Sequence, residues 1–154
     1  MNASAPVAVT LAPRTALAIR VVGWLALAAG LVMIVAGATA WGLVSSELAA
    51  ERITVSEDSA LLPGADVTGP LTAYAEAEVI STHALEASEG LTYAELDRDD
   101  PVRATVMNAS FLRASLFTSV VSFGVAALVI GLGLFVGMLG WVLTRLAAPA
   151  RPVA

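Results

Sequence analysis

The sequence contains no cysteine, no lysine and a single histidine, His83. The lack of cysteine excludes disulfides, thiolate nucleophiles and cysteine metal sites. One histidine is too few for haem held between bundle histidines. Eight scattered arginines form no basic stripe for phosphate binding, so we expect no nucleic-acid partner. Charged residues make up only 14% of the chain against about 25% in soluble domains, which disfavours a soluble enzyme.

What the chain has instead is two long stretches without charge, residues 21–46 and 114–144. About 20 apolar residues suffice to cross a bilayer as a helix. We therefore predict membrane spans at 21–46 and 120–144, the second beginning only after the first uncharged turns. A cleaved signal peptide is the alternative for the first stretch, with residues 38–40 as the cleavage motif, but signal apolar regions run to only about 7–15 residues.

Glycines, and no ionisable residues, mark the two spans. Intramembrane ionisable groups are typical of ion pathways and proton relays, so their absence disfavours a proton-coupled transporter. Small residues allow helices to approach closely, although glycine is also common in membrane helices generally. We predict helix packing, within an antiparallel hairpin or between hairpins and other helices, through Gly23, Gly30, Gly37, Gly133, Gly137 and Gly140.

Charge is divided sharply along the chain. All 13 acidic residues lie between Glu47 and Asp100, whereas the two flanks carry four arginines and no acid. Positively charged flanks stay in the cytoplasm. The predicted order is a cytoplasmic arm (1–20), a span (21–46), an acidic extracytoplasmic region (47–119), a span (120–144) and a cytoplasmic tail (145–154).

The three tryptophans agree with this orientation. Aromatic side chains gather at both membrane–water interfaces. Trp24 and Trp141 would lie at the inner interface and Trp41 at the outer one, and we predict all three as interface anchors.

Two further helices are predicted from local signals in the acidic region. Residues 68–70 are a helix-start signal with proline in the first turn, and Gly90 is a helix-stop signal. Together they predict a helix over 71–89. Aspartate and proline at 99–101 signal the start of a long helix that runs to Arg145. The second span forms the C-terminal part of this helix. A short extended piece is expected at 53–56.

The side chains of the 71–89 helix are expected to divide into an inner and an outer face. By helical spacing, the inner face holds Leu71, Ala75, Val79 and His83. The outer face holds Glu76, Glu86 and Glu89.

The chemistry-bearing residues do not complete a known site. His83 with Glu76, Glu86 and Glu89 lacks the ligand count of a di-iron bundle or a zinc site. The acidic run 97–100 lacks the spacing of a calcium loop, and no nucleophile elbow or phosphate loop is present. We predict no catalytic residue, no metal and no cofactor.

Residues 80–129, with TYAELDRDDP followed by NASFLRASLFTSVV, resemble a family of small two-span membrane proteins of actinobacteria. Its members are often labelled aromatic ring-opening dioxygenase, small subunit. Iron sites of such enzymes need two histidines and a carboxylate, and this chain has one histidine. The resemblance thus implies an actinobacterial plasma membrane and no catalytic residue.

These observations predict an all-α membrane protein, an antiparallel two-helix transmembrane hairpin with a small acidic helical cap outside. The second transmembrane helix extends outward into the cap. The expected role is a non-catalytic structural or accessory subunit that associates with the lipid bilayer and with itself or a larger membrane complex. The alternative is an extracytoplasmic ligand or cation sensor that signals through the long second helix.

The predicted orientation can be tested with single cysteines, because the chain has none of its own. A membrane-impermeant maleimide should label Asp97→Cys in intact cells, and Thr10→Cys and Ala150→Cys only after the membrane is permeabilised. Labelling of either terminal cysteine in intact cells would contradict the orientation.

Overall fold

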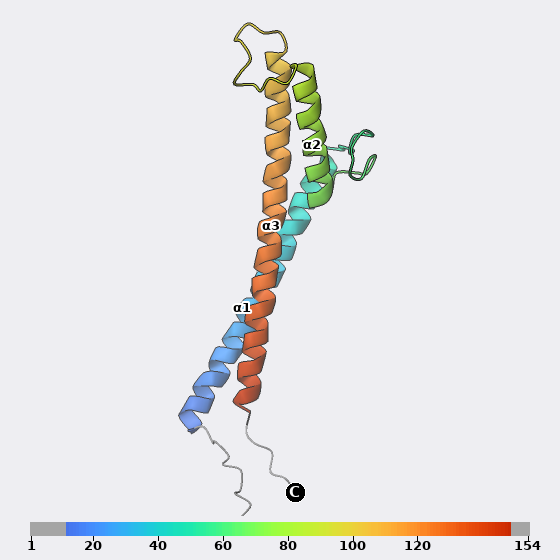
Figure 1. The fold of residues 1–154 in the computed structure, drawn as a ribbon. Coiled ribbons are helices and arrows are strands. Elements are labelled where there is room, and N and C mark those ends of the chain that lie inside the picture. The colour runs from blue at the N-terminus through green and yellow to red at the C-terminus, as the bar shows by residue number, and fades with distance from the viewer. Residues whose placement is uncertain (1–11, 149–154) are drawn as a thin grey trace, which may run out of the picture. The chain divides into compact units, whose positions relative to one another are not determined.

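The computed structural model describes residues 12–148 and contains three helices there: α1 (Pro13–Ala50), α2 (Pro70–Ala87) and α3 (Arg103–Leu146) (Figure 1). Within those residues the only β-type pairing is an isolated antiparallel bridge between Thr54 and Asp66. The all-helical prediction is confirmed for this part of the chain. The outer parts of the predicted arm and tail, 1–11 and 149–154, lie outside the described residues.

Helices α1 and α3 are each long and apolar enough to span a membrane. In the most apolar 18-residue stretch of each helix, only 17% is buried. A helix that is apolar all round either lies in a protein core or faces lipid. Because most of these residues are not covered by protein, the two helices differ from the core helices of a soluble domain.

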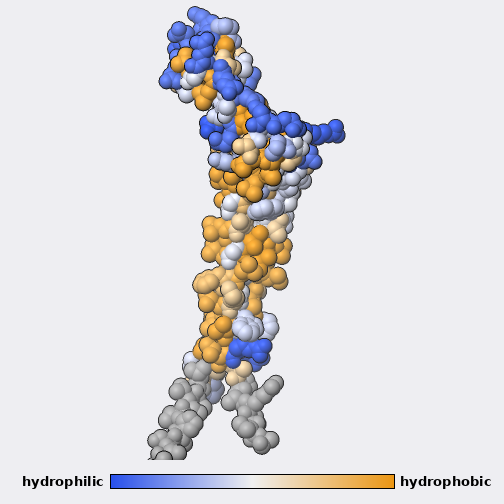
Figure 2. Space-filling model, turned by 45° about the vertical axis from the view of Figure 1, so that its right-hand side comes forward, coloured by the Kyte–Doolittle hydropathy of each residue, from blue (hydrophilic) through white to orange (hydrophobic). Residues whose placement is uncertain are grey.

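The chain divides into two compact units. The first, here called the apolar pair, consists of the described residues 12–35 and 129–148. The second, the acidic domain, consists of residues 36–128 and contains every acidic residue. Figure 2 shows apolar surface over the paired helix segments and hydrophilic surface gathered over the loops of the acidic domain.

In the apolar pair, α1 and α3 approach backbone to backbone at glycines. A Cβ built on Gly30 would lie 2.5 Å from the carbonyl oxygen of Gly133, and one built on Gly133 would lie 2.8 Å from that of Gly30. Gly23 and Gly140 show the same reciprocal approach, at 2.9 and 2.6 Å. The earlier glycine of one helix thus meets the later glycine of the other, so the two segments run antiparallel. Only residues without a side chain permit so close an approach.

The acidic domain is built around α2, which lies beside α3 (Figure 1). The segment between α1 and α2 contributes Val55 and Val67, each 1% exposed, to the core. Backbone hydrogen bonds from Val55 to Ala65 and from Val67 to Ile53 hold these two valines in register. The buried core of the domain comprises Leu48, Val55, Val67, Ala73, Ala75, Ala77, Leu116 and Phe123.

The limits of α2 follow the local signals. Pro70 is the first helical residue, and the Gly69 amide donates to the Thr72 hydroxyl at 3.1 Å, which satisfies one of the free amides at the helix start. At the other end the Gly90 amide donates to the Leu85 carbonyl at 2.7 Å, with Gly90 at φ +88°. This left-handed conformation favours glycine.

Helix α3 begins two residues later than predicted. The Asp100 carboxylate accepts a hydrogen bond from the Val102 amide at 2.8 Å, and regular helix starts at Arg103. Pro101 and Val102 form the turn before it.

Three predicted orientations on α2 are wrong. His83, expected inside, has a side chain that is 49% exposed, because its imidazole contacts the loop segment before α2. Leu71, expected inside, is 71% exposed, because it lies in the first turn, outside the α2 face that packs into the core. Glu76, expected outside, is only 7% exposed. The 53–67 segment folds over that side of α2, and the Ser56 amide donates to the Glu76 carboxylate at 2.8 Å. The extended segment therefore covers a face of the helix that residue spacing alone assigned to solvent.

The glycine contact predicts opposite effects for two nearby substitutions in α3. Gly133→Ala should destabilise the chain by about 1–3 kcal/mol, because its Cβ would meet the backbone of α1. Gly131→Ala, whose Cβ meets nothing within 4 Å, should be neutral or stabilise by up to about 1 kcal/mol through helix propensity. Denaturant unfolding of both variants in mild detergent checks this, and equal effects would contradict the contact.

Candidate functional site

Five of the six predicted packing glycines lie in the apolar pair, and Gly37 lies in the acidic domain, where it is buried. Gly137 differs from its neighbours. A Cβ there would meet nothing within 4 Å, yet its own backbone nitrogen lies 2.8 Å from the Cβ position of Gly30. The structure therefore brings Gly30, Gly133 and Gly137 together at one point. Their part in assembly stays a prediction.

An open apolar groove of about 350 Å³ lies over this glycine contact. Both helices contribute to it, and its lining carries almost no polar surface. The side chains along it are Leu27, Leu31 and Ile34 of α1 and Leu134, Met138 and Trp141 of α3.

The three tryptophans have different surroundings. Trp24 and Trp141, both in the apolar pair, are 60% and 54% exposed, and the Arg145 guanidinium lies 5.3 Å from the Trp141 ring centroid. Trp41, in the acidic domain, packs edge-on against Phe123 with ring centroids 4.7 Å apart. Trp41 is thus partly a packing residue, and the role of all three as interface anchors stays a prediction.

Two polar contacts fasten the 53–67 segment to α2. The first is the buried Glu76 carboxylate, which accepts hydrogen bonds from the amide of Ser56 at 2.8 Å and from its hydroxyl at 3.2 Å. A buried carboxylate without a partner costs folding free energy, so these bonds stabilise both the segment and the helix face.

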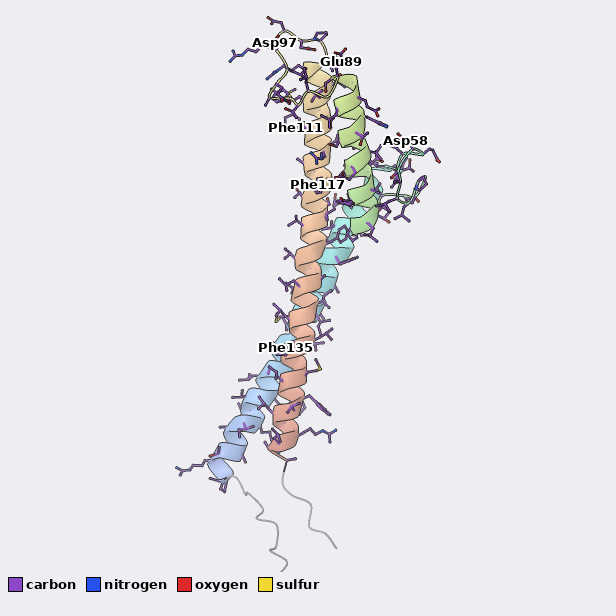
Figure 3. The ribbon with its side chains drawn as sticks, viewed as in Figure 1. Asp58, Glu89, Asp97, Phe111, Phe117 and Phe135 are labelled. Carbon is purple, nitrogen blue, oxygen red and sulfur yellow. The ribbon has the colours of Figure 1, made fainter. Side chains whose placement is uncertain are left out.

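The second contact joins His83 of α2 to Asp58 of the segment, with Nε2 and Oδ2 2.6 Å apart. Asp58 lies on the loop beside α2 (Figure 3). Both side chains are exposed. The hydrogen bond from the imidazole lowers the pKa of Asp58 below 3.8. The same bond, with the charges of Asp58 and more distant Glu86 and Glu76, raises the pKa of His83 above 6.5. At neutral pH the pair is therefore more strongly charged than an isolated histidine and aspartate would be.

No group of three or more histidine, aspartate or glutamate side chains is close enough to hold a metal anywhere in residues 12–148. The carboxylates near His83 in sequence take other positions. Glu76 binds Ser56, whereas the imidazole meets Asp58, which is 25 residues away along the chain.

Two open pockets of similar size flank α2, and their charges differ. One, of about 370 Å³ between the 58–61 segment and α2, is lined by the carboxylates Asp58 and Glu78. The other, of about 350 Å³ between α2 and α3, has no acidic residue in its lining and includes Arg113. We call the second the arginine pocket.

No protein-family model, curated protein or solved structure matches the chain. The resemblance of residues 80–129 to two-span actinobacterial proteins therefore stays a prediction.

Sequence reasoning missed Ser56, Asp58 and Arg113 as members of sites. Each meets its neighbours only because the segment before α2 or the turn after it brings separate parts of the chain together. Local spacing carries no signal for such contacts. The charge of Arg113 was visible, but only as the boundary of an uncharged stretch.

The Asp58–His83 pair predicts a defined pH dependence. Because the pKa of His83 is raised and that of Asp58 lowered, the pair stabilises the folded chain fully between pH 3.8 and 6.5. This stabilisation is lost as the pH rises through the raised pKa of His83, or falls through the lowered pKa of Asp58.

The pKa of the single histidine can be followed by NMR in a chain without a histidine tag. Asp58→Asn should move the His83 titration midpoint down toward 6.5, since its main cause is removed. Glu57→Gln, a change to the neighbouring acid, should leave it in place. An unchanged midpoint in Asp58→Asn would show that the pair does not form in solution.

Proposed function

We propose that this chain is a non-catalytic, two-span membrane protein that serves as a structural or accessory subunit. In this proposal α1 and α3 cross the bilayer as an antiparallel hairpin in the region of the apolar pair. The low burial of their most apolar stretches supports it, because lipid would cover side chains that protein leaves open.

The proposed orientation has both termini in the cytoplasm and the acidic domain outside. The arginines near the ends, Arg14, Arg20 and Arg145, support it, since positive flanks are retained on the inner side. The acidic domain carries a net charge of −9 and contains every aspartate and glutamate of the chain.

The groove over the glycine contact is the observation that carries the accessory role. Within the pair the glycines already face each other, so a third helix would meet the groove beside them. An apolar ridge on a second copy or on a foreign membrane subunit would fill that space and gain dispersion contacts. Catalysis is not part of the proposal, because the sequence offers no nucleophile motif or phosphate loop.

A second candidate is an extracytoplasmic ligand or cation sensor, favoured by the two pockets beside α2. A ligand that binds only the folded acidic domain would raise its melting temperature. No shift across a panel of cations and small molecules would remove the support for this candidate.

The accessory role is tested by pull-down of the tagged chain from native membranes in mild detergent, with mass photometry and protein identification on one eluate. We expect a stoichiometric assembly, either with foreign subunits or with further copies of the chain. Recovery of a lone monomer would contradict the proposal.

A matched pair of substitutions tests the groove itself. Leu31 and Leu25 of α1 are similarly exposed, at 63% and 65%, but only Leu31 lines the groove. Leu31→Trp should fill the groove and reduce the recovered partner several-fold, whereas Leu25→Trp should leave it unchanged. Equal recovery with both variants would place the partner elsewhere.

A further inference from the structure

We propose that the arginine pocket binds an anionic amphiphile, with a phosphate or carboxylate head paired to Arg113 and a short apolar chain along the pocket wall. The argument starts from charge. Thirteen acids and four arginines give the acidic domain a net charge of −9, yet none of those acids lines this pocket. The pocket across α2 has two carboxylates in its lining and would repel the same ligand.

Arg113 is a cation without a carboxylate partner. The ion pair between Asp58 and His83 is the only one within residues 12–148. The Arg113 guanidinium instead lies 5.3 Å from the Phe117 ring centroid, and Phe117 packs edge-on against Tyr74 of α2. The aromatic contact positions the charge at the pocket, and the planar guanidinium can bind a phosphate or carboxylate through two parallel hydrogen bonds.

Arg103, ten residues earlier on α3, shows how an arginine in this domain is otherwise used. Its guanidinium donates to the Leu96 carbonyl and lies 4.1 Å from the Tyr93 ring centroid. Those contacts tie the turn before α3 to the helix. Of the two pockets beside α2, only the arginine pocket has an arginine in its lining, and that residue is Arg113.

The rest of the pocket suits a ligand with one polar and one apolar end. Its lining includes residues that carry hydroxyl groups, among them Ser81, Tyr93 and Ser110, and the apolar residues Leu85 and Val106. From Val106 to Arg113 is seven residues of α3, or about 10 Å along the helix axis. A volume of about 350 Å³ lies within the range of small-molecule sites.

The source of the anion is either a lipid headgroup or a soluble molecule, and the lipid source rests on the proposed membrane function. If the second span begins near residue 120, the Arg113 backbone lies about 10 Å above it, at the outer edge of the headgroup region. The pocket itself does not depend on that placement.

The test uses the full chain purified in a neutral detergent, with dissociation constants measured by calorimetry. The lipid probe is dihexanoyl phosphatidylglycerol, the soluble probe is hexyl phosphate, and dihexanoyl phosphatidylcholine is the probe without net charge. We expect at least one anionic probe to bind about tenfold or more tightly than the phosphatidylcholine. Preference for phosphatidylglycerol would assign the lipid source and preference for hexyl phosphate the soluble one.

Three variants locate the site. R113Q should weaken anion binding at least about tenfold, the loss of one charge-assisted interaction. A109F should weaken it as well, because Ala109 lines the pocket and a phenyl ring would occupy it while leaving the charge in place. R98Q removes an arginine outside the pocket and should change nothing.

Circular dichroism and the melting temperature without ligand show that each variant is folded. Equal binding of the anionic probes by wild type and folded R113Q would overturn the proposal, as would no binding of either probe by wild type. Neither of these results bears on the accessory role. That role is tested by the pull-down alone, where recovery of a monomer would contradict it.

Discussion

The backbone contact between α1 and α3 at Gly30 and Gly133 is the constraint on which the apolar pair depends. In the proposed bilayer setting, apolar helices gain little from covering one another, so dispersion at close range has to hold them together. Side chains would keep the axes apart, and only paired glycines bring carbonyl oxygens within about 3 Å of the facing Cβ positions. The same contact sets the register, because Gly23 then meets Gly140, and it leaves the open apolar groove beside it.

The acidic domain is held by different means. Its core is small and rich in alanine, and it is completed by Val55 and Val67 from a segment that has almost no regular structure. Such a segment needs polar contacts to fix its place, and the buried Glu76 carboxylate and the exposed Asp58–His83 pair supply them. Because the second of these contacts titrates, the stability of this part of the domain depends on pH.

Charge is the feature that links both units to the proposed roles. Net negative charge in residues 36–128 and positive flanks fit the proposed two-span protein with an external domain. Within that acidic domain, a pocket that holds Arg113 and no carboxylate is a local exception to the prevailing sign. An anionic ligand would favour this pocket, because the negative field over the rest of the domain would repel it.

Local patterns were enough to predict the three helices, the proline start of α2 and its glycine stop, because these depend on neighbours within a few residues. They failed where the chain folds back on itself. Spacing placed Glu76 outside and Leu71 inside. In the structure the segment over α2 buries Glu76, whereas Leu71 is exposed to solvent. The partner of His83 and the pocket around Arg113 join residues far apart in sequence, so only the tertiary fold decides them.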